Sequence, residues 1–130
     1  MLFFGHRFLE SSSFYHINSI DAITNTPPSS SIYLTFSEEN LDIIHHLNAN
    51  EITYALSVSN ITELMYASSL GCDFIIVEKD LAKTAQLVAE TYLFDAKILV
   101  STAEESDIEE FALLGVDGVI FANAVIKVNS

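Results

Sequence analysis

An internal repeat is the feature of this sequence that most constrains its fold. Segment 70–76, Leu-Gly-Cys-Asp-Phe-Ile-Ile, aligns with segment 114–120, Leu-Gly-Val-Asp-Gly-Val-Ile, which lies 44 positions later. Each copy contains an apolar strand that ends in serine, an amphipathic helix that ends at a glycine, and a second strand that follows at once. This alternation is typical of a parallel sheet, because parallel strands need a crossover connection that is usually a helix.

The alternation of strands and helices extends from residue 32 to residue 121. The predicted strands are 32–36, 52–57, 73–78, 97–101 and 118–121, and the predicted helices are 38–47, 61–70, 81–94 and a fourth that ends at 114. Right-handed crossovers place helices on both faces of such a sheet, which gives a parallel five-stranded, flavodoxin-like three-layer sandwich. The same repeats, with Gly-x-Asp before a strand, resemble the units of TIM barrels. Five strands are too few to close an eight-stranded barrel, so the alternative is a half-TIM-barrel completed by dimerisation.

Residues 1–30 do not follow this pattern, although 2–4 and 14–17 are short strand candidates. We therefore divide the chain into an N-terminal arm or extra strand, 1–30, and an α/β domain, 31–130. The arm is rich in large apolar side chains that need a cover, either the edge of the chain's own sheet or a second subunit. A homo-oligomer is therefore expected, and a two-fold dimer is the commonest form. The side chains concerned are Leu2, Phe3, Phe4, Phe8, Leu9, Phe14 and Tyr15.

The charge composition restricts the possible partners. Eighteen acidic residues against five basic ones give a formal net charge of -13. A chain this acidic repels phosphate backbones and anionic lipid surfaces, which argues against binding to nucleic acid or to membranes. Cys72 is the only cysteine, and its apolar surroundings predict a small buried hydrophobe in a reducing compartment. Without the basic start and apolar run of a signal peptide, the chain is expected to be cytoplasmic.

The candidate binding residues follow the predicted strands. In open parallel sheets, ligands bind beyond the carboxyl ends of the strands. Two carboxylates beside a lysine could act as an acid/base pair or hold a cation, and the hydroxyl groups could bind phosphate together with helix N-termini. Each group also has a structural interpretation as a helix cap, a surface ion pair or a solvated side chain. The candidates are Ser37, Glu78, Lys79, Asp80, Ser101 and Thr102.

No catalytic residue, metal ligand or cofactor is assigned from the sequence. Glycine-rich phosphate-binding motifs and the HExxH and CxxC metal motifs are absent. His45 and His46 are adjacent on a predicted helix, where they point about 100° apart and do not chelate one ion together. The run Gly5-His6-Arg7 resembles the opening of glycerophosphodiester phosphodiesterases, although the acidic metal-binding pattern of that family does not follow it.

Three segments, 72–78, 98–103 and 114–121, resemble the third, fourth and fifth strands of a response-regulator receiver domain. The resemblance implies a five-stranded flavodoxin-like fold in which Glu78 occupies the phosphoacceptor position. Ala122 and Asn123 stand where the family has Lys-Pro, and Thr102 is the one site residue retained. The resemblance therefore implies a receiver-like domain that does not transfer phosphate.

The sequence favours a non-enzymatic protein-interaction module, receiver-like without a phosphorylation site. The alternative is a small enzyme or ligand-binding protein whose site lies at the C-terminal ends of the parallel strands, with Glu78, Asp80 and Thr102 as its polar groups. A buried polar pocket at that edge would favour the alternative, whereas a flat, capped edge would favour the module.

Overall fold

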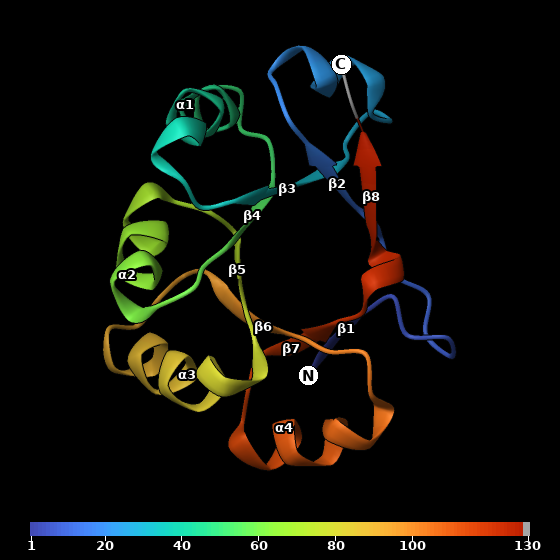
Figure 1. The fold of residues 1–130 in the computed structure, drawn as a ribbon, viewed down its shortest axis with the longest axis vertical. Helices are drawn as coiled ribbons and strands as arrows, with labels where there is room; N and C mark the ends of the chain where they lie inside the picture. Colours follow the sequence, from blue (N-terminus) through green and yellow to red (C-terminus); the bar gives the residue numbers. More distant parts are fainter. Residues whose placement is uncertain (129–130) are drawn as a thin grey trace.

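The computed structural model describes residues 1–128, which form one curled sheet of eight parallel strands with helices packed around it (Figure 1). The strand order is β1-β7-β6-β5-β4-β3-β2-β8, and every neighbouring pair is parallel. The strands are β1 (Leu2–Phe4), β2 (Phe14–Ile17), β3 (Ser31–Thr35), β4 (Tyr54–Ser57), β5 (Phe74–Val77), β6 (Lys97–Ser101), β7 (Gly118–Ile120) and β8 (Val125–Val128).

Four α-helices connect the middle strands, and each lies where the apolar periodicity predicts one. They are α1 (Leu41–Ala49), α2 (Ile61–Leu70), α3 (Ala82–Thr91) and α4 (Ile108–Leu114). Short 3-10 turns lead into three of them: η2 (Glu38–Asn40), η3 (Lys79–Leu81) and η4 (Glu105–Asp107). Gly71 and Gly115 end α2 and α4 with positive φ angles of 93° and 77°, the left-handed conformation that glycine adopts without a steric penalty.

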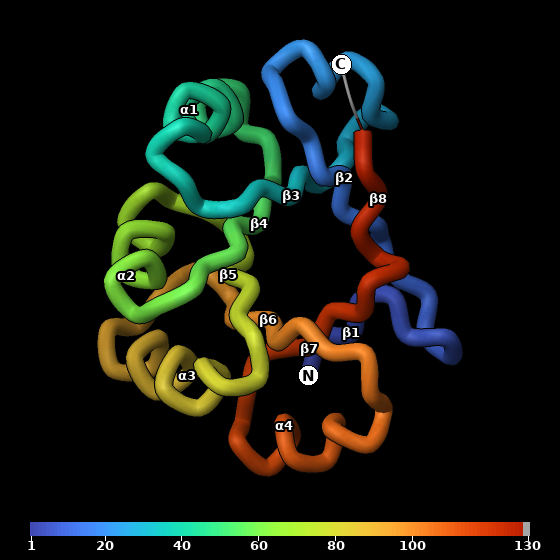
Figure 2. Tube along the Cα trace, viewed as in Figure 1, coloured from blue at the N-terminus to red at the C-terminus, as the bar shows by residue number. Residues whose placement is uncertain are grey.

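The expected five-stranded flavodoxin-like sandwich is wrong, and the half-barrel alternative fits the structure. The connection between β7 and β8 shows why the sheet must curl, because β7 lies beside one edge strand whereas β8 is the opposite edge. In a flat sheet these two strands would be roughly 29 Å apart. The five Cα–Cα steps from Ile120 to Val125 span at most about 19 Å. The Cα trace of the strands accordingly follows a ring-like outline (Figure 2).

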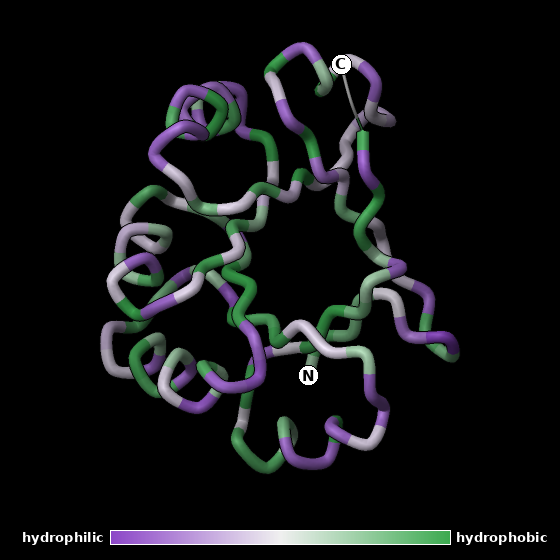
Figure 3. Tube along the Cα trace, viewed as in Figure 1, coloured by the Kyte–Doolittle hydropathy of each residue, from purple (hydrophilic) through white to green (hydrophobic). Residues whose placement is uncertain are grey.

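Curling gives the sheet an inner and an outer face, and side chains alternate between two hydrophobic clusters. Outward side chains such as Leu56, Ile75 and Val100 pack beneath the helices. Inward side chains fill the space enclosed by the sheet, and these are Phe14, Ala55, Ile76, Leu99, Ile120 and Ala124, with Phe4, Tyr33, Phe74 and Val125 packed against them. Hydrophobic residues occur along much of the ring of strands, while the outer helices alternate between hydrophobic and hydrophilic residues (Figure 3). Strand β5 is buried on both faces, since Ile75 and Ile76 are buried in different clusters.

The N-terminal arm supplies two strands of the same sheet. Phe4 on β1 and Phe14 on β2 both point into the inner cluster, where their rings lie 5.1 Å apart and each lies 5.5 Å from the ring of Phe74. Of the two covers expected for the arm, the chain's own sheet is therefore the one used. Phe8 and Leu9, in the loop between β1 and β2, remain exposed. Self-association stays a prediction, but these buried phenylalanines no longer require it.

The two aspartates of the repeat, Asp73 and Asp117, make equivalent hydrogen bonds to a neighbouring strand. The Asp73 carboxylate accepts a hydrogen bond from the backbone N–H of Tyr54 at 3.0 Å, and the Asp117 carboxylate accepts one from Ile98 at 2.9 Å. Each aspartate thus fastens the start of one strand to the start of its neighbour. Asp117 in turn donates its backbone N–H to Oε1 of Gln86, a buried polar side chain on α3. The repeated Gly-x-Asp is therefore a structural element at the N-terminal ends of the strands.

Replacing Gly118 by alanine is expected to loosen β1. A Cβ atom at position 118 would lie 2.8 Å from both the carbonyl oxygen and the Cβ of Leu2, across the β1–β7 ladder. A backbone oxygen cannot rotate away, so we expect a loss of about 1–3 kcal/mol in the free energy of unfolding. Urea denaturation measures this loss, and limited proteolysis reports whether the N-terminal segment is released.

Gly115→Ala is the matched control for this substitution. A Cβ at 115 meets no atom within 4 Å, but the φ angle of 77° makes alanine unfavourable there by about 1–2 kcal/mol. Both variants should therefore lose stability, while only Gly118→Ala should expose the N-terminus to protease. Equal protection of the N-terminus in the two variants would show that β1 does not pair closely with β7.

Candidate functional site

The predicted site residues Glu78 and Asp80 lie together in a small hollow at the C-terminal ends of β3, β4 and β5. Both carboxylates are exposed, because β5 ends at Val77 and the chain turns there into η3. The hollow has a volume of about 260 Å³, and Ile76 contributes to its lining. Its other polar groups are hydroxyls, from Tyr33, Ser57 and Ser59. The arrangement offers acceptors and hydroxyls for a cationic or polyhydroxylated ligand.

Lys79 does not belong to this hollow. Its Nζ pairs with Oδ1 of Asp107 at 3.1 Å and with Oε2 of Glu110 at 3.3 Å, so it links η3 to the start of α4. The hydrogen bonds to these two carboxylates raise the pKa of Lys79 above its usual value. Glu78, Lys79 and Asp80 are therefore not one acid/base group, and the structural interpretation of Lys79 as an ion-paired side chain is confirmed.

The three predicted hydroxyl groups lie apart from this hollow. The Ser37 hydroxyl accepts a hydrogen bond from the N–H of Glu39 at 3.2 Å and caps η2. Thr102 Oγ1 accepts one from the N–H of Glu104 at 3.1 Å, in the turn that precedes η4. Ser101 is half-buried at the end of β6, where it pairs with Ile120 of β7. Ser37 and Thr102 therefore act in local turns, as their structural interpretation predicts.

A second hollow of about 510 Å³ at the same edge contains a charged cluster of His6, Arg7 and Glu105. The Glu105 carboxylate accepts hydrogen bonds from Arg7 at 2.9 and 3.1 Å, and its Oε1 lies 2.8 Å from Nε2 of His6. The hydrogen bond from Arg7 is the main cause that holds the pKa of Glu105 below its usual value, and the same bond raises the pKa of Arg7. The cluster thus ties the end of β1 to η4 through charges that neutralise one another.

Aromatic rings enclose the histidine of this cluster. The His6 side chain is only 8% exposed, and its ring lies 5.0 to 5.9 Å from those of Phe3, Phe8 and Phe121. Nδ1 accepts a hydrogen bond from the backbone N–H of Phe8 at 3.2 Å. With Nδ1 acting as an acceptor, Nε2 carries the ring proton and donates a hydrogen bond to Oε1 of Glu105. Both nitrogens are therefore engaged within the protein.

Sequence reasoning singled out Gly5, His6 and Arg7 but did not connect them with Glu105 or Asn123. Gly5 has a positive φ of 80°, and a Cβ there would lie 2.5 Å from Oδ1 of Asn123. Only glycine lets the end of β1 pass so close to the β7–β8 connection. The position of His6 and Arg7 directly after a strand was the available signal. Their partner Glu105 is 98 or more positions away, in a different part of the sequence pattern.

The remaining buried ionisable groups are structural. Burial is the main cause that raises the pKa of the Cys72 thiol to about 12, and the thiol donates a hydrogen bond to the carbonyl of Ala67 at 3.3 Å. Burial likewise raises the pKa of Tyr54 to about 12, and its hydroxyl donates to Oδ1 of Asn48 at 2.9 Å. A thiol that remains protonated is a poor nucleophile, so the expectation that Cys72 is a small buried hydrophobe is confirmed.

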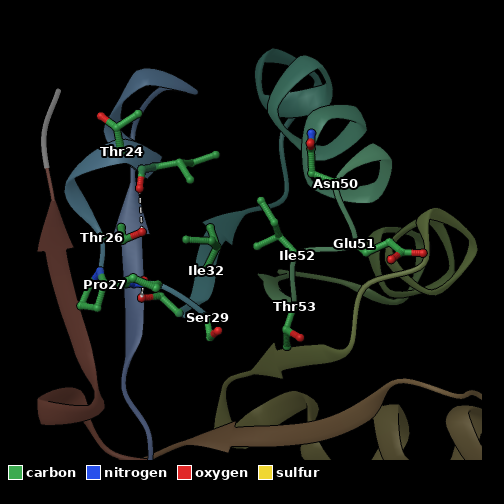
Figure 4. Close-up of a pocket in the computed structure, with 12 residues that line it drawn as sticks. Thr24, Thr26, Pro27, Ser29, Ile32, Asn50, Glu51, Ile52 and Thr53 are labelled. Carbon is green, nitrogen blue, oxygen red and sulfur yellow. Dashed lines mark hydrogen bonds between the residues drawn. The ribbon is translucent and has the colours of Figure 1, made fainter.

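A further pocket of about 510 Å³ lies at the opposite end of the sheet, between the loop that precedes β3 and the loop that precedes β4 (Figure 4). Ile32 and Ile52 contribute apolar surface, while Thr24, Glu51 and Thr53 contribute polar atoms. It is lined by one carboxylate and no basic side chain. Since it lies at the N-terminal ends of β3 and β4, it is separate from both hollows at the strand ends.

The outer surface between α1 and α2 carries an apolar groove of about 450 Å³. Tyr66, Ser69 and Leu70 share one face of α2, since they are three and four positions apart. Opposite them lie Phe36, Glu38 and Leu41, from the segment that leads into α1. The rings of Phe36 and Tyr66 are 6.1 Å apart, and Tyr66 is 56% exposed.

These features define an all-parallel α/β protein with a curled, barrel-like sheet, in which Arg7 and Lys79 near the strand ends are paired with carboxylates. Comparisons with models of protein families and with curated proteins found no match for this chain. Across residues 1–128, no three His, Cys, Asp or Glu side chains gather in a way that could hold a metal ion. None of the helices described has the length and apolar character needed to cross a bilayer.

Proposed function

We propose that this protein is a non-enzymatic protein-interaction module. The observation that carries the proposal is the contrast between its two surfaces. At the strand ends, the basic side chains His6, Arg7 and Lys79 are bonded to carboxylates, whereas the groove between α1 and α2 leaves the ring of Tyr66 exposed beside half-buried leucines. A tyrosine beside apolar walls is the kind of surface on which a partner's side chain can be buried.

The contacts at the rim of the sheet also support a non-enzymatic function. In barrel enzymes, catalytic residues project from the C-terminal ends of several strands toward one point. At the rim, His6 and Arg7 are both engaged by Glu105. These contacts leave neither His6 nor Arg7 free to act on a substrate.

A second candidate function is ligand binding in the hollow that contains Glu78 and Asp80. It is favoured by one observation, the convergence of these two carboxylates with three hydroxyl groups at the C-terminal ends of adjacent strands. The ligand would carry positive charge or several hydroxyl groups, as the acceptors around it require. Thr102, which was expected to belong to this site, is held in its own turn.

Three segments of the chain resemble a receiver domain, and we propose that the protein does not transfer phosphate. The curled eight-stranded sheet differs from the five-stranded sheet that the receiver resemblance implied, so the resemblance contributes only the likeness of three segments. The cytoplasm is proposed as the location, on the grounds of an acidic chain with one buried thiol. Self-association is proposed as a second mode of binding, which light scattering coupled to size exclusion would detect.

Incubation with acetyl phosphate is expected to leave the intact mass unchanged. Glu78 occupies the phosphoacceptor position with a side chain one methylene longer than aspartate. Lys79, the nearest base in sequence, is held by Asp107 and Glu110. Lys79 is therefore not free to neutralise a phosphoryl group on Glu78. Mass spectrometry measures the result, with an active receiver domain as the positive control. A stable gain of one phosphoryl group that disappears in Glu78→Gln would refute the proposal.

A further inference from the structure

We infer that the groove between α1 and α2 binds an apolar side chain from a positively charged segment of a partner protein. The inference rests on the proposed interaction function and adds to it the location of the docking site and the chemistry of the partner. It follows from two independent observations, the shape and lining of the groove and the distribution of charge over the chain.

The lining of the groove suits one large apolar side chain. Phe36, Leu41 and Leu70 are half-buried and form apolar walls, while Tyr66 is exposed beside them. Tyrosine contributes a rigid ring and one hydroxyl, a combination that is enriched among residues dominating protein interfaces. The only charged group in the lining is the carboxylate of Glu38, which is exposed. An apolar side chain would therefore pack against the apolar walls, while a cation beside it would pair with the carboxylate of Glu38.

The charge distribution of the chain indicates the sign of the partner's charge. Lysine and arginine are absent from residues 8–78, the part of the chain that contains α1 and α2. The same span carries the acids Glu10, Asp21, Glu38, Glu39, Asp42, Glu51, Glu63, Asp73 and Glu78. Such a one-sided distribution attracts cationic partners and repels anionic ones. The basic residues that are paired, Arg7 and Lys79, lie outside this span and are bonded to Glu105 and to the start of α4.

A second copy of this chain is a poor occupant for the same reason. Each copy has a net charge of -13, so two acidic surfaces would face one another at the groove. Of the large apolar side chains of the N-terminal arm, Phe4 and Phe14 are packed inside their own sheet and cannot dock there. A basic segment of a different protein avoids both obstacles.

Three fluorescein-labelled peptides test the inference by fluorescence anisotropy with the full chain. The first is an amphipathic peptide with leucines at positions i, i+3, i+4 and i+7 and lysines at the flanking positions. The second replaces the lysines by glutamates, and the third keeps the lysines but replaces the leucines by serines. We expect the first to bind at least about tenfold more tightly than either of the others, with an affinity that falls as salt is added.

Two protein variants and one control locate the binding. Tyr66→Ser should weaken binding of the leucine–lysine peptide by at least about tenfold, the effect of removing an interface aromatic anchor. Glu38→Gln combined with Glu39→Gln should reduce the salt dependence. Leu113→Ser removes another exposed apolar side chain, 83% exposed on α4, and should leave binding unchanged. The four substituted side chains are all exposed, so none of the substitutions should disturb the core; they are Glu38, Glu39, Tyr66 and Leu113. Circular dichroism checks that each variant folds.

The outcomes separate this inference from the proposed function. If the leucine–glutamate peptide binds as tightly as the leucine–lysine peptide and Tyr66→Ser abolishes both, the groove is a docking site but the inferred charge of the partner is wrong. If the unliganded protein is a dimer that Tyr66→Ser dissociates, the occupant is a second copy and the inference is overturned. If neither leucine peptide binds, both the inference and the interaction function lose their support.

Discussion

Replacing Phe14 by alanine is expected to lower the free energy of unfolding by about 3–5 kcal/mol, the usual cost of removing a buried phenylalanine side chain. Phe14 is 1% exposed, and its ring contacts those of Phe4 and Phe74 at edge-to-face geometry. It lies on the inner face of the curled sheet, where strands surround it and limit how far the neighbours can collapse into the cavity. The loss should therefore lie toward the upper end of this range.

Phe8→Ala is the matched control, since Phe8 belongs to the same N-terminal segment but is 70% exposed. Its ring contacts the Arg7 guanidinium and the His6 ring, so its removal should cost no more than about 1 kcal/mol. Urea denaturation followed by circular dichroism suits both variants, because the chain has no tryptophan. A Phe14→Ala protein as stable as Phe8→Ala would mean that residues 1–30 form a detachable arm.

Ile76→Ala should destabilise the fold by about 2–5 kcal/mol, as large-to-small substitutions in packed cores do. Ile76 is 3% exposed and packs in the inner cluster with Ala55 and Leu99, while its neighbour Ile75 packs in the outer cluster. The substitution thus tests the inner core alone, without disturbing the contacts between sheet and helices.

Ile126→Ala provides the comparison for this variant, because Ile126 is also in a strand but is 41% exposed at the edge of the sheet. Its loss should be less than about 1 kcal/mol. If Ile76→Ala cost less than about 1 kcal/mol in urea denaturation, the space enclosed by the sheet would not be the packed core described above.

The candidate site was predicted only in part, because proximity across the fold is not encoded in short sequence patterns. Glu78 and Asp80 are adjacent to a strand end, so local reasoning placed them at the correct edge. The Lys79 side chain points toward the start of α4, which begins after residue 107. Its position could therefore not be predicted from the residues next to it in the sequence. The groove between α1 and α2 depends in the same way on how two helices pack side by side.

The sequence by itself determined the parallel α/β class, the positions of the four helices and the five middle strands, and the caps at Gly71 and Gly115. These features follow from local interactions, since apolar periodicity, helix-terminating glycines and short connections all act within a few residues of one another. The repeated aspartates at 73 and 117 belong to the same local pattern, and their equivalent hydrogen bonds show that the repeat is structural.

Only the tertiary structure decided that the sheet has eight strands and curls. The added strands β1, β2 and β8 have three or four residues each, and no α-helix lies between β1 and β2 or between β7 and β8. The sequence indicated β1 and β2 only as isolated strand candidates outside the regular alternation, and it did not predict β8. Their pairings join Leu2 to Gly118 and Phe14 to Val125, at opposite ends of the chain. Short strands gain little from their own residues and become stable when distant strands bury their side chains, here Phe4 and Phe14 against Phe74.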